Sequence, residues 1–214
     1  MQIAILLFEN LDAQDAVGPN EVLQWLPGAE VVFPAKTRGP KTSGRNGLAL
    51  VADRTLDEVA RPDIVVVPGG GGEVRARQDP AILAWLRQVH ETTTWTASVC
   101  SGALVLGAAG ILRGKRAATH WTLMEELAQF GATPVRERYV FDGKIATSAG
   151  VSAGIDMSLA LAAKIGGADI AQAIQLGIEY DPQPPFDGGS PAKCPSALVE
   201  MVRATTRALE PEIG

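Results

Sequence analysis

Thr96-Ala-Ser-Val-Cys100-Ser-Gly-Ala-Leu-Val-Leu106 is the stretch that decides the fold, because an apolar strand runs into a helical pattern with no spacer between them. Cys100 therefore lies on a sharp strand-to-helix turn, the nucleophile-elbow arrangement with sulfur in place of oxygen. Its small neighbours, Ser101 and Gly102, suit so crowded a turn. Unpaired N–H groups and the positive end of the following helix favour a thiolate at this position.

Position alone leaves a second interpretation of Cys100 open, since most free cysteines are small buried hydrophobes. The stretch Pro68-Gly-Gly-Gly-Gly72 favours the interpretation of Cys100 as a nucleophile. It ends another central strand, and ligands in open α/β sheets bind at the carboxyl ends of strands. The N–H of Gly70 is thus a candidate oxyanion donor facing Cys100. A phosphate-binding loop is excluded, because neither Gly-Lys-Ser/Thr nor a spaced glycine fingerprint follows.

An acidic group is expected at the same edge of the sheet, in the stretch Leu11-Asp-Ala-Gln-Asp15-Ala-Val-Gly-Pro19. Asp15 could cap the next helix. Alternatively, it lies beside the thiolate, where burial and like charge raise its pKa and allow it to donate a proton. Spacing alone does not exclude the competing carboxylates Glu9, Asp12 and Glu21.

The two histidines differ in their settings. His120, in Ala117-Ala-Thr-His-Trp121, could reach the site from a neighbouring strand, whereas His90 is expected at the surface near a helix end. A Cys–His pair would be a conventional activated nucleophile. An inert, hydrogen-bonded His120 is equally compatible with the sequence. The two histidines and two dispersed cysteines form no metal-ligand spacing, so no metal site is predicted.

Short apolar runs alternate with longer amphipathic ones, the pattern of an α/β domain with a largely parallel sheet. Four runs predict buried strands: Gln2–Phe8, Glu30–Pro34, Asp63–Pro68 and Trp95–Val99. Seven predict helices: Asn20–Leu26, Asp79–Glu91, Ser101–Ala109, Thr122–Phe130, Ser152–Ile165, Ile170–Ile178 and Ser196–Leu209. Two hairpins are predicted, Ser43–Asp53 around Asn46-Gly47 and Arg138–Thr147 around Asp142-Gly143. The long Pro- and Gly-rich loop Asp181–Pro195 is expected at an interface, a functional surface or a wrapped tail.

Length, net charge and cysteine count limit the class of protein. A chain of 214 residues suits a single domain, 1–214. The net charge of −5 and the lack of a Lys/Arg stripe argue against nucleic acid as a partner. The apolar run Ile3–Phe8 is too short for a membrane span, so we expect no membrane association. Cys100 and Cys194 do not suggest a disulfide framework, which favours the cytoplasm, and Cys194 is read as incidental.

Four of these stretches together resemble the ThiJ/PfpI superfamily, also called class I glutamine-amidotransferase-like proteins: Leu11–Pro19, Val67-Pro-Gly-Gly70, Ser98-Val-Cys-Ser-Gly102 and Ala117–Trp121. Two further ones look like its isocyanide hydratase branch: Val99–Leu112 with Gly114-Lys-Arg-Ala117, and Glu179-Tyr-Asp-Pro-Gln-Pro-Pro-Phe186 with Gly189-Ser-Pro191. The resemblance covers nearly the whole chain.

The resemblance implies a flavodoxin-like three-layer α/β sandwich, a homodimer and no cofactor. It makes Cys100 the nucleophile and Asp15 its partner carboxyl. It also implies backbone donors at Gly70 and Ser101, His120 near the pocket and Val151 in its wall. One departure is Ser101, where hydratases of this type often carry threonine; a hydroxyl is kept.

The reaction implied is hydration of a small isocyanide to an N-substituted formamide through a thioimidate on Cys100. Other enzymes of the same fold are the nearest alternatives: a peptidase, a glyoxalase or a deglycase. Peptidase and glyoxalase branches commonly have histidine after the nucleophile, where this chain has Ser101. A stand-alone redox or ligand sensor is the alternative of a different class, since a low-pKa thiolate is readily oxidised. About 20 residues follow Cys194, too few for the helix-turn-helix region of the related regulators.

Overall fold

The computed structural model describes residues 1–44 and 47–209, and a six-stranded sheet forms its centre. The strand order is β11-β12-β8-β7-β1-β2, and all neighbouring pairs are parallel except β11 with β12. The bounds are β1 (Gln2–Ile5), β2 (Glu30–Val32), β7 (Ile64–Val67), β8 (Trp95–Ser98), β11 (Tyr139–Asp142) and β12 (Ile145–Ser148). The four predicted strands all lie in this sheet, and the Asp142-Gly143 hairpin is confirmed as β11–β12.

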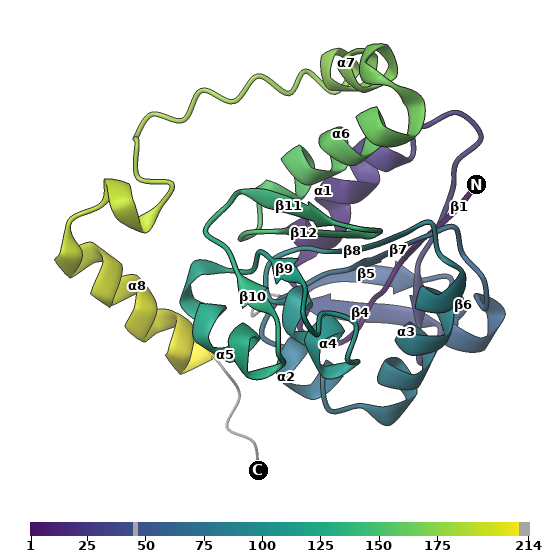
Figure 1. The fold of residues 1–214 in the computed structure, drawn as a ribbon, viewed down its shortest axis with the longest axis horizontal. Helices are drawn as coiled ribbons and strands as arrows, with labels where there is room; N and C mark the ends of the chain where they lie inside the picture. The colour runs from purple at the N-terminus through teal and green to yellow at the C-terminus, as the bar shows by residue number, and fades with distance from the viewer. Residues whose placement is uncertain (45–46, 210–214) are drawn as a thin grey trace.

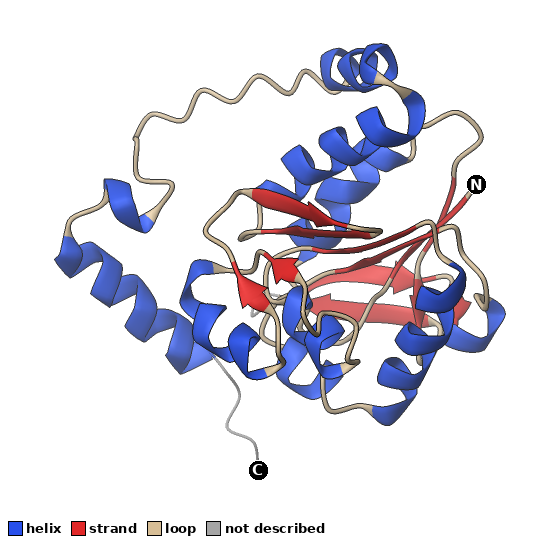
Figure 2. Ribbon diagram, in the orientation of Figure 1, coloured by secondary structure: helices blue, strands red, loops and turns tan. Residues whose placement is uncertain are grey.

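Helices cover both faces of the sheet, so the predicted three-layer α/β architecture is confirmed (Figures 1 and 2). One face carries α1 (Ala13–Leu23), α6 (Ala153–Gly166) and α7 (Ala168–Gly177). The other carries α2 (Glu73–Ala76), α3 (Pro80–Thr92), α4 (Gly102–Ala108) and α5 (Met124–Gln129). Asp79 caps α3 as its sequence predicts, because its carboxylate accepts the N–H of Ala81 at 3.0 Å.

The core lies between these layers as one contiguous cluster of buried apolar side chains. The central strands β1 and β7 contribute uninterrupted β-branched and aliphatic runs because both of their faces are covered. Every residue of Ile64–Val67 is 0% exposed. Burial of each such side chain contributes roughly 1.5–3 kcal/mol before entropy is subtracted. This rigid centre fixes where the strand ends, and hence the site, must lie.

Smaller paired elements surround the main sheet. The first predicted hairpin is present as β4 (Gly39–Ser43) paired antiparallel with β5 (Leu48–Ala52). Of its predicted turn residues, Asn46 lies outside the described part of the chain. Two short parallel pairs were not predicted: β3 (Pro34–Ala35) with β6 (Arg54–Thr55), and β9 (Arg116–Ala117) with β10 (Thr133–Pro134). A strand of two residues is too short to show a recognisable alternation of apolar and polar side chains.

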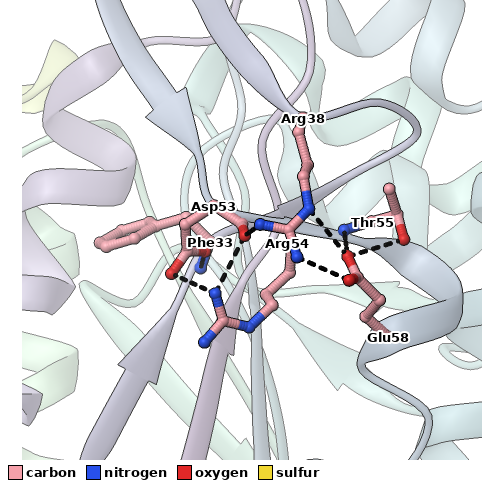
Figure 3. Close-up of polar contacts among 6 residues, drawn as sticks. All are labelled: Phe33, Arg38, Asp53, Arg54, Thr55 and Glu58. Atoms are coloured by element: carbon pink, nitrogen blue, oxygen red, sulfur yellow. Dashed lines mark hydrogen bonds and ion pairs between the residues drawn. The ribbon is translucent and has the colours of Figure 1, made fainter.

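Polar contacts hold the β3–β6 region together, as Figure 3 shows. Asp53 accepts the N–H of Phe33 at 2.7 Å, and Arg38 bonds Glu58 at 2.6 Å. Glu58 also accepts the N–H of Thr55 at 2.7 Å. The side chains of Arg38 and Glu58 are both about half exposed. Their ion pair therefore adds little stability, and its main effect is to orient the two segments.

The start of the first helix and the setting of His90 differ from what the sequence predicts. The first helix begins at Ala13, not Asn20, and Asp12 rather than Asp15 is its N-cap, accepting the N–H of Gln14 at 3.1 Å. His90 is half-buried, not at the surface, with Nδ1 2.8 Å from the hydroxyl of Thr96. The Thr96 side chain is fully buried, and its hydroxyl has two polar partners, the imidazole and the hydroxyl of Thr93 at 2.9 Å.

The chain after α7 leaves the body of the molecule. Residues 181–190 form an extended loop, a 3-10 helix follows at Pro191–Lys193, and α8 (Ser196–Leu209) then lies beside α5 (Figure 1). The guanidinium of Arg203 on α8 lies 5.1 Å from the centre of the Trp121 ring. Over residues 1–44 and 47–209, no helix is long and apolar enough to cross a membrane.

Candidate active site

Cys100 occupies the predicted elbow between β8 and α4, with φ at 57°. Only glycine enters this left-handed region freely, so the surrounding structure must hold the cysteine there. The N–H of Cys100 donates to the carbonyl of Ala149 at 3.1 Å, and its own carbonyl accepts the Thr119 hydroxyl at 2.9 Å. A Cβ on Gly102 would lie 2.1 Å from the carbonyl oxygen of Val67. The turn thus requires a residue without a side chain at position 102.

Asp15 lies in the first turn of α1 and is 0% exposed. Its Oδ2 accepts the N–H of Gly69 at 2.8 Å, while Oδ1 has no hydrogen-bond partner among the described residues. Burial, followed by the charge of Asp12, raises the pKa of the Asp15 carboxyl to about 7. The N–H of Gly69 and the Cys100 thiol lower that pKa by less. Near neutral pH the carboxyl can therefore hold a proton.

The thiol of Cys100 is also buried, and burial raises its pKa, as does the negative charge of Asp15. The N–H groups of Val151 and Ser101 act in the opposite direction. This differs from the thiolate predicted from the helix end, since α4 is short and desolvation outweighs it. Two buried acids in contact share a proton, and only the first negative charge is accommodated easily. When Asp15 holds that proton, its repulsion of a thiolate disappears, and the two N–H groups then offset part of the effect of burial.

The backbone donors lie differently from what the sequence predicts. The N–H of Gly70 donates to the hydroxyl of Ser101 at 3.0 Å. It is the N–H of Val151, with that of Ser101, that interacts with the sulfur of Cys100. Val151 was expected only as a pocket wall. Its φ of 31° is rare for a β-branched residue, and no sequence signal announces it.

His120 lies at the edge of the site and is half-buried. Its Nδ1 is 2.6 Å from the hydroxyl of Thr122, and a Cβ on Gly150 would lie 2.6 Å from its Cδ2. Burial lowers the pKa of the imidazole. No hydrogen bond joins His120 to Cys100 within the described chain. The geometry therefore gives a packed histidine that is hydrogen-bonded to Thr122 and does not contact Cys100.

A pocket of about 530 Å³ opens beside these residues. His120 and Val151, two predicted site residues, line it, and Cys100 does not, being buried beneath. The remaining lining residues come from four stretches of the chain: Thr119, Trp121 and Met124; Val135–Arg138; Ala149, Gly150 and Ser152; and Gly189–Ala192 of the C-terminal loop. The loop therefore completes the wall of the pocket.

The other candidate carboxylates do not take the place of Asp15 beside Cys100. Glu9 is exposed and accepts the hydroxyl of Thr42 at 2.8 Å. Glu21 is exposed, and Asp12 caps α1. Among residues 1–44 and 47–209, no three histidine, cysteine, aspartate or glutamate side chains converge as a metal ion would need.

The geometry can be set beside known proteins. A family model of the DJ-1/PfpI family matches residues 1–164. Over 203 residues the chain is 43% identical to an isonitrile hydratase of Pseudomonas putida, covering 95% of this chain and 89% of that protein. A shorter match to the HTH-type transcriptional regulator CdhR of Pseudomonas aeruginosa is 33% identical and covers 59% of this chain and 38% of the regulator.

A solved structure agrees with these matches over nearly the full length. The crystal structure of a ThiJ/PfpI family protein from Pseudomonas syringae superposes with a TM-score of 0.91 at 37% identity, covering 98% of this chain and 88% of that one. The resemblance inferred from the motifs around Cys100 is thereby confirmed, together with the flavodoxin-like fold. This chain belongs to the DJ-1/PfpI family.

Proposed function

We propose that this protein is an enzyme that hydrates small isocyanides to N-substituted formamides, with Cys100 as nucleophile and Asp15 as proton donor. The observation that carries the proposal is the buried Asp15–Cys100 pair, in which the carboxyl has its pKa raised to about 7. The isonitrile hydratase of Pseudomonas putida, 43% identical over 95% of this chain, supports the substrate class.

The first step forms the covalent intermediate. The thiolate of Cys100 attacks the terminal carbon of R–N≡C, and the proton held by Asp15 is transferred to that carbon, which gives a thioimidate, S–CH=N–R. An isocyanide carbon accepts a nucleophile well only if a proton arrives as it reacts, so a neutral carboxyl beside a thiolate is the arrangement required. The step leaves Asp15 ionised.

The second step restores the pair. Water adds across the C=N bond, with hydroxyl on carbon and hydrogen on nitrogen. Collapse of this tetrahedral species expels the thiolate of Cys100, and the hydroxyl proton passes to the Asp15 carboxylate. The product is R–NH–CHO, and the net change is the addition of one water. One difficult hydration is thus divided into two easier steps.

The neighbours of the pair have supporting roles in this scheme. The N–H groups of Val151 and Ser101 stabilise negative charge on sulfur each time the thiolate forms. The N–H of Gly70, which donates to the Ser101 hydroxyl, is a further donor from the glycine-rich loop beside the turn that carries Cys100. The group R occupies the pocket lined by His120 and Val151. We further propose that the chain is one domain, 1–214, acting in the cytoplasm as a homodimer without a cofactor.

The test is formamide production from cyclohexyl isocyanide, followed spectroscopically. The native protein should turn over, Cys100→Ala should be inactive, and Cys194→Ala, the control for loss of a thiol, should keep native activity. Asp15→Asn should lower turnover by roughly 10²-fold or more if the carboxyl moves a proton. Native-level turnover by Cys100→Ala would end the proposal. Lactate from methylglyoxal in place of formamide would favour glyoxalase chemistry at the same cysteine.

A further inference from the structure

A second cavity, of about 370 Å³, is lined by Gly72 of the glycine-rich loop and does not include Cys100. It shares no lining residue with the pocket beside Val151. Its walls include Leu7 and Phe8, which follow β1, and Gly72, Arg75 and Ala76, which lie in the segment after β7. Strands β1 and β7 are neighbours, and the chain continues outward in opposite directions from them. This is the switch point of the sheet, where open α/β folds present ligand sites.

The lining of this cavity combines apolar and basic side chains. Leu7, Phe8 and Ile82 form the apolar part, and three cations line the cavity: Lys36, Lys41 and Arg75. Two carboxylates, Glu9 and Asp79, line it as well. The lining thus carries one more positive than negative charge, in contrast to the net charge of −5 for the whole chain.

Lys41 is the residue that needs explanation. Its side chain is only 9% exposed, so little of it is in contact with water. The contacts that replace water are long: 3.3 Å to the hydroxyl of Thr37, 3.4 Å to the carbonyl of Pro40 and 4.0 Å to Glu9. A well-paired ammonium has an anionic oxygen at about 2.7–2.9 Å. A buried charge without such a partner is unfavourable, and an anion in the cavity would supply one.

The two carboxylates of the lining already have other partners. Glu9 turns Oε2 to the N–H and hydroxyl of Thr42 at 3.0 and 2.8 Å. Asp79 bonds Lys36 at 2.6 Å and caps α3. Arg75, by contrast, has no ion-pair or hydrogen-bond partner for its guanidinium within residues 1–44 and 47–209. Two cations of the cavity, Lys41 and Arg75, therefore remain available to one ligand.

We propose that this cavity binds a small organic anion, a carboxylate or phosphate monoester, whose head group bonds Lys41 and Arg75. Its apolar part lies over Leu7, Phe8 and Ile82. The site is separate from the Cys100 pocket and independent of the isocyanide chemistry proposed above.

The test uses benzoate and phenyl phosphate as probes, with neutral benzamide as the matched control ligand. Titration of the native protein, followed by amide chemical shifts, should show one probe or both perturbing the signals around Lys41 and Arg75. Benzamide should not bind. Comparison of the two anions decides between carboxylate and phosphate.

Variants locate the site. Lys41→Met should weaken binding about tenfold or more, which corresponds to 1.4 kcal/mol, and so should Arg75→Gln, an exposed position that decides the matter if Lys41→Met does not fold. Lys164→Met, on the opposite face of the sheet, should bind as the native protein does. All three should still hydrate cyclohexyl isocyanide if that activity is present, so the two proposals fail separately. Absence of binding by the native protein, or equal affinity in the Lys41 and Arg75 variants, would overturn the proposal.

Discussion

The single carboxyl to which we assign proton transfer, that of Asp15, lowers the stability of the fold when it is ionised. Its pKa is raised to about 7 because burial removes it from water. An unfolded chain leaves an aspartate with a pKa near 3.9. Between these two values the folded state binds more protons than the unfolded one, so the free energy of unfolding falls as pH rises through this window.

Asp15→Asn should therefore make the protein more stable at pH 8. The amide keeps an acceptor for the N–H of Gly69 and has no proton to lose, so the gain should be on the order of a few kcal/mol at pH 8 and near zero at pH 4. Urea unfolding at several pH values measures it. Equal pH dependence in Asp15→Asn and native protein would mean that another group carries the effect.

The sequence identified the principal residues of the site but not their connections. Cys100 and Asp15 could be predicted because a strand-to-helix junction and the end of β1 place them at one edge of the sheet. The contribution of Val151 could not be predicted. Its N–H interacts with the sulfur because the residue has a positive φ, which a β-branched residue rarely adopts and the sequence does not indicate. The bond between Gly70 and Ser101 could not be predicted either, since it depends on two loops 31 residues apart.

At the scale of elements, the sequence predicted the strands and most helices and misplaced the start of α1. Gly18 and Pro19 are signals for a loop, yet both are within the helix. A Cβ on Gly18 would lie 3.2 Å from the side chain of Ile155 on α6, so the glycine serves close packing of two helices. Tertiary contact of this kind has no local signature.

The elbow between β8 and α4 should be intolerant of the smallest added side chain. Gly102→Ala places a Cβ against the carbonyl of Val67, and we expect a loss of about 1–3 kcal/mol in the free energy of unfolding. Gly177→Ala, in α7 with nothing within 4 Å, is the matched control and should gain up to about 1 kcal/mol. Urea unfolding distinguishes them. A neutral Gly102→Ala would show that the turn can relax.

The end of α3 depends on one lysine from the neighbouring hairpin. Lys144 donates to the carbonyls of His90, Glu91 and Thr93, two of them at 3.5 and 3.2 Å. Lys144→Met should cost about 1 kcal/mol in urea unfolding, because the last carbonyls of the helix lose their donor and a favourable charge. Amide exchange in the last turn should quicken. Lys193→Met, which removes an exposed ion pair, should stay within about 0.5 kcal/mol of native.

At the scale of the whole molecule, the C-terminal region is attached lightly. No residue from 175 to 206 is buried. One connection is the hydroxyl of Tyr180, which donates to Asp156 at 3.0 Å. The loop that completes the pocket wall thus rests on few contacts, while the sheet behind Cys100 is rigid.

Trypsin should accordingly cleave first after Lys193, leaving residues 1–177 intact. Mass spectrometry of early digests identifies the cut. The KM for cyclohexyl isocyanide should rise after cleavage, because Gly189–Ala192 are no longer held in the wall. A Lys193→Gln protein, which lacks the site, controls for other cuts. Protection of Lys193 at high protein concentration only would indicate that a second copy covers this loop.

The site around Cys100 is assembled from chain segments that are distant in sequence. Its hydrogen bonds join Gly69 to Asp15 across 54 positions, and Ser148 to Ser98 across 50. Contacts between residues so far apart in sequence form late in folding, because the chain must lose the entropy of closing long loops before these contacts can stabilise it. During refolding, helical signal should return well before catalytic competence. Throughout that interval the thiol of Cys100 can be alkylated. Brief pulses of iodoacetamide at successive refolding times would therefore show when the thiol becomes buried.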